Sequence, residues 1–214
     1  RLTIAEGLTS VEIIALLTTT EGLAGPVPQR VAEGSLLPET YFFTYGDGRA
    51  EILGRMQRSL EELLEAQWRE RGSGSPLRSK QEALVLASII EKETGVAGER
   101  ARISSVFHNR LRIGMRLQSD PTVIYGLTRG SGALGRSLTR DDLNAESPYN
   151  TYRVAGLPPT PIANAGRASI MAAFKPARTD DLYFVAKGEG GHVFARSLNE
   201  HNANVAKWRR LMRD

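Results

Sequence analysis

The feature that most limits the fold of this chain is a start signal for helices that recurs along the sequence. The pattern Ser/Thr-x-x-Glu precedes three stretches with helical periodicity, at Thr9, Ser79 and Ser197. Strand-like alternation is clearest in three short segments, at 2–5, 182–187 and 192–196. The helices and strands do not alternate as they would around a parallel sheet. We therefore predict an α+β fold with antiparallel strands.

Apolar periodicity and capping residues predict eight helices. The expected segments are 9–17, 49–71, 80–93, 99–112, 121–127, 139–143, 167–174 and a terminal helix that begins after Ser197. The last two strands are expected to form a hairpin, because the glycine-rich run 188–191 joins them.

The run 72–76, Gly-Ser-Gly-Ser-Pro, divides the chain and coincides with a change of charge. Residues 1–75 carry 7 Lys+Arg against 11 Asp+Glu, a net charge of −4, whereas residues 76–214 carry 21 against 13, a net charge of +8. We expect a small, partial LysM-like αβ subdomain with its linker at 1–45, a connecting helix with the Gly/Ser linker at 46–75, and an α+β domain at 76–214.

Composition and motifs exclude several classes of function. The basic part is compatible with a polyanionic partner or with an ordinary solvated surface, but nucleic-acid-binding motifs are absent from the sequence. The chain has no cysteine, and its three histidines lack metal-ligand spacing. P-loop, GxGxxG and GxSxG motifs are also absent. We therefore expect neither a metal nor a cofactor, and no nucleic acid as a partner.

Two carboxylates lie close together in the helix predicted over 80–93. Glu91 and Glu93 are two residues apart, which separates them by about 200° around a helix, so they cannot serve one site as a facing pair. The apolar residues of this helix centre on the direction of Glu93. We therefore expect Glu93 on or beside the buried face and Glu91 nearer to solvent.

Burial and the negative end of the helix dipole both raise the pKa of a carboxyl group. A carboxylic acid that stays protonated near neutral pH is what general-acid cleavage of a glycosidic bond requires. The competing interpretation is that Glu93 forms an ion pair with Arg100, Arg102 or Lys92. Spacing alone leaves both interpretations open.

Two further segments carry polar residues that could contact a ligand. Gln118 and Ser119 precede Asp120, which is expected to be the N-cap of the next helix because Pro121 follows it. The segment 147–152 includes a strand predicted at 149–152. It offers aromatic faces and an amide that suit a carbohydrate, although tyrosines packed in a core are an equal alternative.

Long runs of this sequence closely resemble the YceG-like endolytic murein transglycosylases. They are ASIIEKET (87–94), SVFHNRL (105–111), RIGMRLQSDPTVIYGL (112–127), SPYNTY (147–152), GLPPTPIAN (156–164) and LYFVAKGEGGHVFARSLNEHN (182–202). Upstream, LTIAEGLTSVEIIALL (2–17) resembles that family's LysM-like segment, and EGSLLPETYFF (33–43) resembles its linker. The resemblance covers essentially the whole chain and implies that 76–214 is the catalytic domain, with a catalytic helix.

The resemblance implies cleavage of the β-1,4 bond between N-acetylmuramic acid and N-acetylglucosamine in peptidoglycan, without water, to leave a 1,6-anhydromuramic acid end. It implies that Glu93 is the single general acid and then the base, since Glu93-Thr94 matches the Glu-Ser of other lytic transglycosylases. It also places six residues around the glycan: Gln118, Ser119, Tyr149, Asn150, Tyr152 and Asn164.

The resemblance further implies a membrane anchor upstream of this sequence, in the bacterial inner (plasma) membrane, with this part facing the periplasm or the cell exterior. Peptidoglycan synthases (penicillin-binding proteins) are the implied partners, and release of nascent glycan strands is the implied role. A non-catalytic peptidoglycan-binding module is the alternative. A pyridoxal-phosphate lyase is a third class, but neither its Schiff-base lysine nor its phosphate cup can be located in the sequence.

Overall fold

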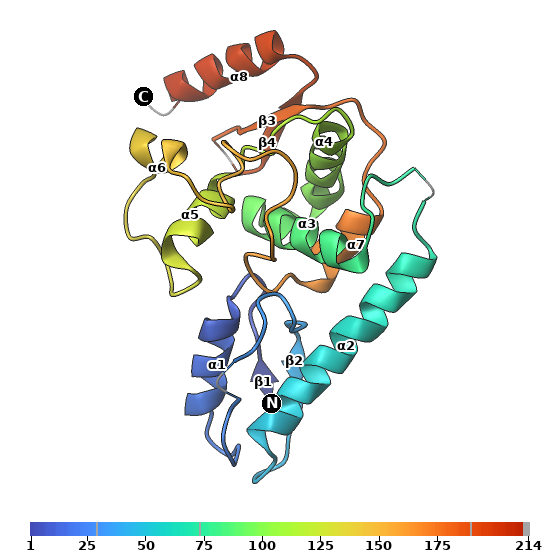
Figure 1. Cartoon of the computed structure of the whole chain (residues 1–214), viewed down its shortest axis with the longest axis vertical. Coiled ribbons are helices and arrows are strands. Elements are labelled where there is room, and N and C mark those ends of the chain that lie inside the picture. The colour runs from blue at the N-terminus through green and yellow to red at the C-terminus, as the bar shows by residue number, and fades with distance from the viewer. Residues whose placement is uncertain (29, 73, 189, 212–214) are drawn as a thin grey trace.

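The computed structural model describes residues 1–28, 30–72, 74–188 and 190–211. Helices dominate, and each of the two sheets found in these ranges is an antiparallel pair of short strands, which confirms the α+β class. Figure 1 shows the N-terminal elements at one end of the molecule, a group of helices in the middle, and the last hairpin with the C-terminal helix at the other end.

The N-terminal end is built from β1 (Leu2–Thr3), α1 (Ser10–Thr19), β2 (Thr40–Tyr41) and the start of α2 (Arg49–Arg69). Leu2 is opposite Tyr41 in the β1–β2 pair. The capping box predicted at Thr9 is present, because Thr9 and Glu12 accept each other's backbone N–H groups. Ten buried residues form the core of this part: Leu2, Ile4, Ile13, Leu17, Leu23, Leu36, Tyr41, Ile52, Leu53 and Met56.

The middle of the molecule surrounds α3 (Lys80–Glu93), whose predicted boundaries are confirmed. A short 3-10 turn, η1 (Ala97–Glu99), follows it. The remaining helices here are α4 (Arg100–Arg112), α5 (Asp120–Thr128), α6 (Arg140–Asn144) and α7 (Arg167–Phe174). All eight residues from Ala83 to Ile90 are buried. Helices α2, α4, α5 and α7 all contact α3, so α3 is the central helix of the larger core.

The C-terminal end consists of the hairpin β3 (Tyr183–Ala186) with β4 (His192–Ala195), followed by α8 (Leu198–Leu211). Phe184 of the hairpin contacts Phe107 of α4 edge to face, with ring centroids 5.9 Å apart. Helix α8 packs on the hairpin, and every residue of α8 is at least partly exposed. Glu189, part of the predicted glycine-rich turn, lies outside the described residues.

Helix α2 contributes to both cores. Its first half supplies Ile52, Leu53 and Met56 to the N-terminal core, and its second half supplies Leu60 and Leu63 to the larger one. The predicted linker at 72–76 follows this helix, and its Ser73 is outside the described residues. In the part of the chain that the structure describes, no helix combines the length and the apolar composition that a membrane crossing requires.

Candidate active site

A cavity of about 530 Å³ opens beside the C-terminal end of α3, and Glu93 lines it. Its walls come from segments far apart in the sequence: the end of α3, α4, the start of α5, the 147–152 turn, the hairpin and α8. The lining residues are Glu93, Arg110, Gln118, Asp120, Tyr152, Tyr183, Phe184, Val185, Leu198, His201, Asn202, Val205 and Trp208. The cavity lining therefore combines charged and polar groups with aromatic and aliphatic side chains.

Glu93 is the last residue of α3, and a hydrogen bond fixes its carboxyl group. The hydroxyl of Ser119 donates to Oε1 of Glu93 at 2.5 Å. Ser119 itself is 1% exposed, and its backbone N–H donates to Oγ1 of Thr151 at 3.0 Å. The hydroxyl that holds Glu93 is thus part of the buried structure and not a mobile surface group.

The surroundings of Glu93 change its acidity. Burial raises the pKa of Glu93 from 4.5 to about 7, and the charge of Asp120 acts in the same direction. The hydrogen bond from Ser119 and the positive charge of Arg110 oppose this rise in pKa. Near neutral pH a substantial fraction of Glu93 therefore carries its proton, as a general acid requires.

The three cations that the sequence offers as ion-pair partners of Glu93 contact other groups. Arg100 lies 3.7 Å from both Glu91 and Glu6, and Arg102 pairs with Asp181 at 2.6 Å. Lys92 donates to the backbone oxygen of Gly7. The three cations considered as partners of Glu93 are thus engaged by other groups.

The prediction that Glu91 lies near solvent is wrong. Its side chain is 6% exposed, and in addition to the contact with Arg100 it accepts the backbone N–H of Gly166 at 2.9 Å. The N-terminal segment, with Glu6 and Gly7, covers the face of α3 that the apolar pattern leaves outside. Glu91 thus links α3 to Arg100 at the start of α4 and to Gly166 before α7. It does not line the Glu93 cavity.

The prediction that Asp120 is an N-cap is also wrong. Helix α5 begins at Asp120, its N-cap is Ser119, and no side chain caps it by a hydrogen bond. The carboxylate of Asp120 instead lines the cavity and accepts a hydrogen bond from the hydroxyl of Tyr152 at 2.6 Å. The cavity therefore contains two carboxyl groups, Glu93 and Asp120.

Gln118 reaches the cavity through an unusual backbone conformation. Its φ is 50°, in the left-handed region, and its N–H donates to the backbone oxygen of Thr151 at 3.1 Å. A residue other than glycine is strained there, and such strain is concentrated at functional sites. The same conformation turns the chain from Leu117, which is fully buried, toward the start of α5.

Four predicted glycan-binding residues are not part of the cavity lining: Ser119, which holds Glu93, and three others whose polar atoms also bond within the protein. The hydroxyl of Tyr149 pairs with Oγ1 of Thr160 at 2.7 Å, as a packed core tyrosine would. Asn150 donates to the backbone oxygens of Leu143 and Ala145. The segment that carries both residues is a turn, so the predicted strand over 149–152 is wrong.

Asn164, the third of these residues, is fully buried at the junction of the two cores. Its Oδ1 accepts the backbone N–H of Leu36 at 3.0 Å, and its Nδ2 donates to the backbone oxygen of Leu8 at 3.0 Å. Nδ2 also lies within hydrogen-bond distance of Ser10 and Glu33. Asn164 thus joins the N-terminal segment to the larger core.

Several cavity residues were missed by the sequence interpretation. Arg110 is 6% exposed, and its guanidinium donates to the backbone oxygens of Leu182 and Leu117 at 2.7 and 2.6 Å. An arginine in the apolar stripe of α4 was the available signal for this residue. Tyr183 of β3 and Trp208 of α8 also line the cavity, and α8 packs on the hairpin. Within the described ranges, no three His, Cys, Asp or Glu side chains gather in a way that could hold a metal ion.

The chain is similar in sequence to proteins of a known family. The model of the YceG-like family matches residues 1–207. An endolytic murein transglycosylase of Bacillus subtilis (strain 168) is 41% identical over 177 residues, which are 82% of this chain and 48% of that protein. One of Streptococcus pneumoniae (strain D39) is 33% identical over 185 residues, which are 82% of this chain and 32% of that protein.

A similar fold has been solved by crystallography. A yceG-like protein of Listeria monocytogenes superposes with a TM-score of 0.69 at 32% identity, over 94% of this chain and 75% of that one. The chain spans about half or less of the length of the curated relatives it matches.

Proposed function

The chain belongs to the YceG-like family, and from this premise we propose that it is an endolytic lytic transglycosylase of peptidoglycan. The bond cleaved is the β-1,4 link between N-acetylmuramic acid and N-acetylglucosamine, and the new end is 1,6-anhydromuramic acid. The observation that carries the proposal is a carboxyl group at a cavity, Glu93, whose burial raises its pKa to about 7. The names of the relatives, endolytic murein transglycosylase, supply the substrate class.

In the first step Glu93 acts as the acid. Its proton passes to the glycosidic oxygen as the bond from C1 of muramic acid to that oxygen breaks, which leaves Glu93 ionised. The acetamido group of the same sugar stabilises the positive charge that develops at C1. Ser119 continues to donate to the carboxylate, and Arg110 contributes positive charge to the site.

In the second step Glu93 acts as the base. The ionised carboxylate takes the proton of the 6-hydroxyl of muramic acid as that oxygen bonds to C1. Glu93 is then protonated again, the leaving sugar has gained one proton, and water is not consumed. A pKa near neutrality suits both steps, because one group must give a proton and then recover it.

The test is the substitution Glu93→Gln, with Glu62→Gln on the exposed surface of α2 as the matched control. Purified peptidoglycan is incubated with each variant, and soluble fragments are analysed by mass spectrometry. We expect the control to release anhydro-ended fragments and Glu93→Gln to release none while remaining folded by circular dichroism. Retained activity in a folded Glu93→Gln variant would refute the acid assignment and direct attention to Asp120, the other carboxyl group of the cavity.

Asp120 makes hydrolysis a second candidate. Ordinary glycosidases use two carboxyl groups that flank the scissile bond, and Asp120 lines the same cavity as Glu93. The hydroxyl of Tyr152 donates to Asp120 at 2.6 Å, which holds this carboxyl group in place at the cavity. Transglycosylation is favoured because the relatives bear that name. The two reactions differ by one water in the product.

The wider cellular role is also a proposal. We infer that the protein acts at the bacterial cell wall, since its relatives are murein transglycosylases. An anchor in the inner membrane, peptidoglycan synthases as partners and release of nascent strands stay predictions from the resemblance. Binding to peptidoglycan without release of fragments would favour the alternative of a non-catalytic binding module.

A further inference from the structure

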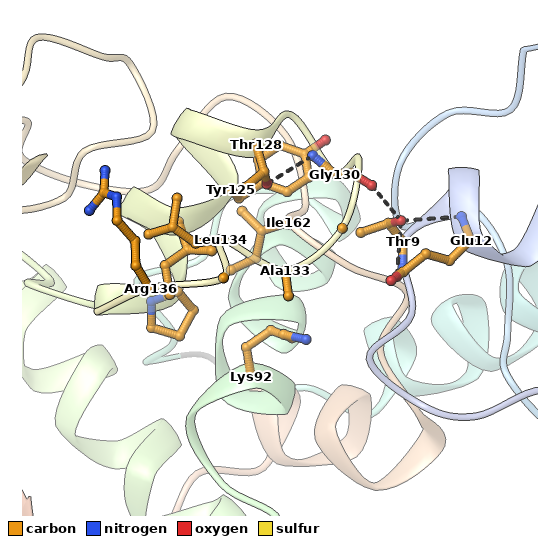
Figure 2. A pocket seen from close by; sticks show the side chains of 14 residues that line it. Thr9, Glu12, Lys92, Tyr125, Thr128, Gly130, Ala133, Leu134, Arg136 and Ile162 are labelled. Atoms are coloured by element: carbon orange, nitrogen blue, oxygen red, sulfur yellow. Dashed lines mark hydrogen bonds between the residues drawn. The ribbon is translucent and has the colours of Figure 1, made fainter. Parts of the chain in front are cut away.

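A second cavity, of about 460 Å³, lies against the same two chain segments that hold the catalytic group (Figure 2). Lys92 lines it, directly before Glu93 in α3, and Pro121 lines it, directly after Asp120 in α5. In each of these two segments, two adjacent residues thus line different cavities: Lys92 and Glu93 in α3, and Pro121 and Asp120 in α5. This second cavity, called the junction pocket below, is therefore next to the proposed reaction centre.

The junction pocket is formed where the N-terminal end meets the larger core. Thr9, the N-cap of α1, and Glu12 in its first turn contribute to the lining, as does the loop 130–136 after α5. The hydroxyl of Thr9 donates to the backbone oxygen of Gly130 at 2.8 Å, a contact drawn in Figure 2. The glycines of this loop have positive φ values, and a Cβ at Gly132 or Gly135 would meet open space. The loop therefore leaves its backbone open to a ligand.

The lining combines an apolar surface with one acidic side chain, Glu12, and two basic ones, Lys92 and Arg136, of which Arg136 is already paired with Asp142. Ile124, Leu134 and Ile162 supply the apolar part. Lys92 is exposed and donates one hydrogen bond, to Gly7 at 3.2 Å, so two of its three donors remain. Both hydrogen bonds that Thr9 donates to Glu12 are accepted by Oε2. The other carboxylate oxygen, Oε1, can therefore accept a hydrogen bond from another donor. A ligand that fits has apolar groups, a carboxylate and an amino group.

On the basis of the proposed function, we propose that the junction pocket binds the stem peptide of the muramic acid at the cleavage site. In peptidoglycan each stem peptide leaves the glycan from the lactyl group of muramic acid. It carries free carboxylates and, at its third residue, an amino group or a cross-link. Lys92 would bind a carboxylate of the peptide, and Glu12 would bind its amino group. The apolar wall and the open loop backbone would contact the alanine methyl groups and the peptide bonds.

This assignment has a consequence for the choice of substrate. Glycan that still carries peptides would be bound at two adjacent places, the Glu93 cavity and the junction pocket. Glycan stripped of peptides would be bound at the first alone. The enzyme would therefore prefer peptide-bearing strands, and the preference would depend on the junction pocket.

The test uses Lys92→Met, with Lys207→Met on the exposed side of α8 as the matched control. The first probe is the free stem pentapeptide L-Ala-γ-D-Glu-L-Lys-D-Ala-D-Ala, titrated into each variant by NMR. We expect the wild type and Lys207→Met to bind it with signals shifting in residues 130–136, and Lys92→Met to bind it about tenfold more weakly, as for the loss of one charged hydrogen bond. A wild type that does not bind the peptide, or equal binding by Lys92→Met, would overturn the proposal.

The second measurement compares kcat/KM on peptide-bearing glycan strands with that on strands stripped by an amidase. Lys92→Met and the apolar-wall variant Leu134→Gln should lose activity on peptide-bearing strands and retain it on stripped strands. Equal losses on both substrates would contradict a peptide site. Failure of the proposed function would give a different result. The wild type would release anhydro ends from neither substrate, and binding of the free peptide could still be measured by NMR.

Discussion

Replacing Glu93 by glutamine should stabilise the folded protein, and the gain should depend on pH. Glu93 lies among protein atoms that disfavour its charged form, and burial is the main cause of its raised pKa. Glutamine has nearly the same shape, can accept the hydrogen bond that Ser119 donates, and is never charged. The substitution therefore removes the cost of burying a charge and leaves the packing in place.

The size of the effect follows from the pKa values. The pKa of Glu93 is 4.5 in the unfolded reference and about 7 in the fold, and each unit is worth about 1.4 kcal/mol. Ionisation above pH 7 therefore costs the folded wild type about 3 kcal/mol relative to the fully protonated state. Glu93→Gln avoids this cost, which for a protein of this size corresponds to a rise in Tm of roughly 6 to 12 °C at pH 8.

The pH window of the gain is fixed by the same values. Below pH 4.5 Glu93 is protonated in both the folded and the unfolded states, so its charge makes no difference between the variants. Between pH 4.5 and about 7 the unfolded chain releases this proton while the folded chain retains it, and the wild type loses stability as the pH rises. Above pH 7 both states are ionised, and the difference between the variants is constant.

The assay is urea unfolding of wild type and Glu93→Gln, followed by circular dichroism at half-unit steps from pH 4 to pH 8.5. The control Glu62→Gln should follow the wild type at every pH. Two free-energy curves that run parallel between pH 4.5 and 7 would refute the reasoning, because Glu93 would then titrate alike in the folded and unfolded chains. A curve for Glu93→Gln that lies below the wild type at pH 8 would refute it as well.

Three further predictions concern residues around the site. Ser119→Ala removes the hydrogen bond that lowers the pKa of Glu93, so the alkaline limb of the pH profile of kcat/KM should move to higher pH; a limb that stays or moves to lower pH contradicts this. Trp208→Ala should raise KM for glycan about 2- to 10-fold with little change in kcat, whereas Trp208→Phe should stay near the wild type, if the indole provides a stacking surface in the cavity. Asn164→Ala should lower the free energy of unfolding by about 2 to 4 kcal/mol in urea, because the buried backbone N–H of Leu36 loses its partner and the backbone oxygen of Leu8 loses one of its two donors; a change below 1 kcal/mol would contradict the role of Asn164 at the junction of the cores.

Local sequence signals were sufficient to predict the bounds of α3 and the face of this helix on which Glu93 lies. The Ser79 side chain accepts the N–H of Glu82, as predicted, and the helix extends from Lys80 to Glu93. Capping and periodicity act within a few residues, so they can be read from the sequence without knowledge of the rest of the fold. The orientation of Glu93 toward a semi-buried site could be predicted for the same reason.

Glu91 shows where this reasoning fails. The periodicity argument assumes one buried face and one exposed face, but the residues of α3 from Ala83 to Ile90 are buried on all sides. The N-terminal segment covers the face that was expected to be open, where Glu91 contacts Arg100 and Gly166. A contact between residues about 75 positions apart leaves no signal in the local pattern.

The cavity wall could not be predicted for the same physical reason. Tyr183 and Trp208 lie about 90 to 115 residues after Glu93 in the sequence and reach the cavity through the packing of α8 on the hairpin. The predicted residues Tyr149 and Asn150 stabilise the neighbouring turn instead of lining the cavity. Sequence runs that resemble a family identify a region of importance, but they do not separate residues that contact a ligand from residues that hold the site in shape.

The most direct test of the central claim is the fate of water in the reaction. Purified peptidoglycan is digested by the wild-type protein in water enriched in oxygen-18, and the new muramic acid ends are analysed by mass spectrometry. A single Glu93 that acts as acid and then base predicts ends lighter by one water than a reducing end and free of oxygen-18, and no such ends with Glu93→Gln. Reducing ends that carry oxygen-18 would contradict the account and identify the cavity of Glu93 and Asp120 as that of a hydrolase.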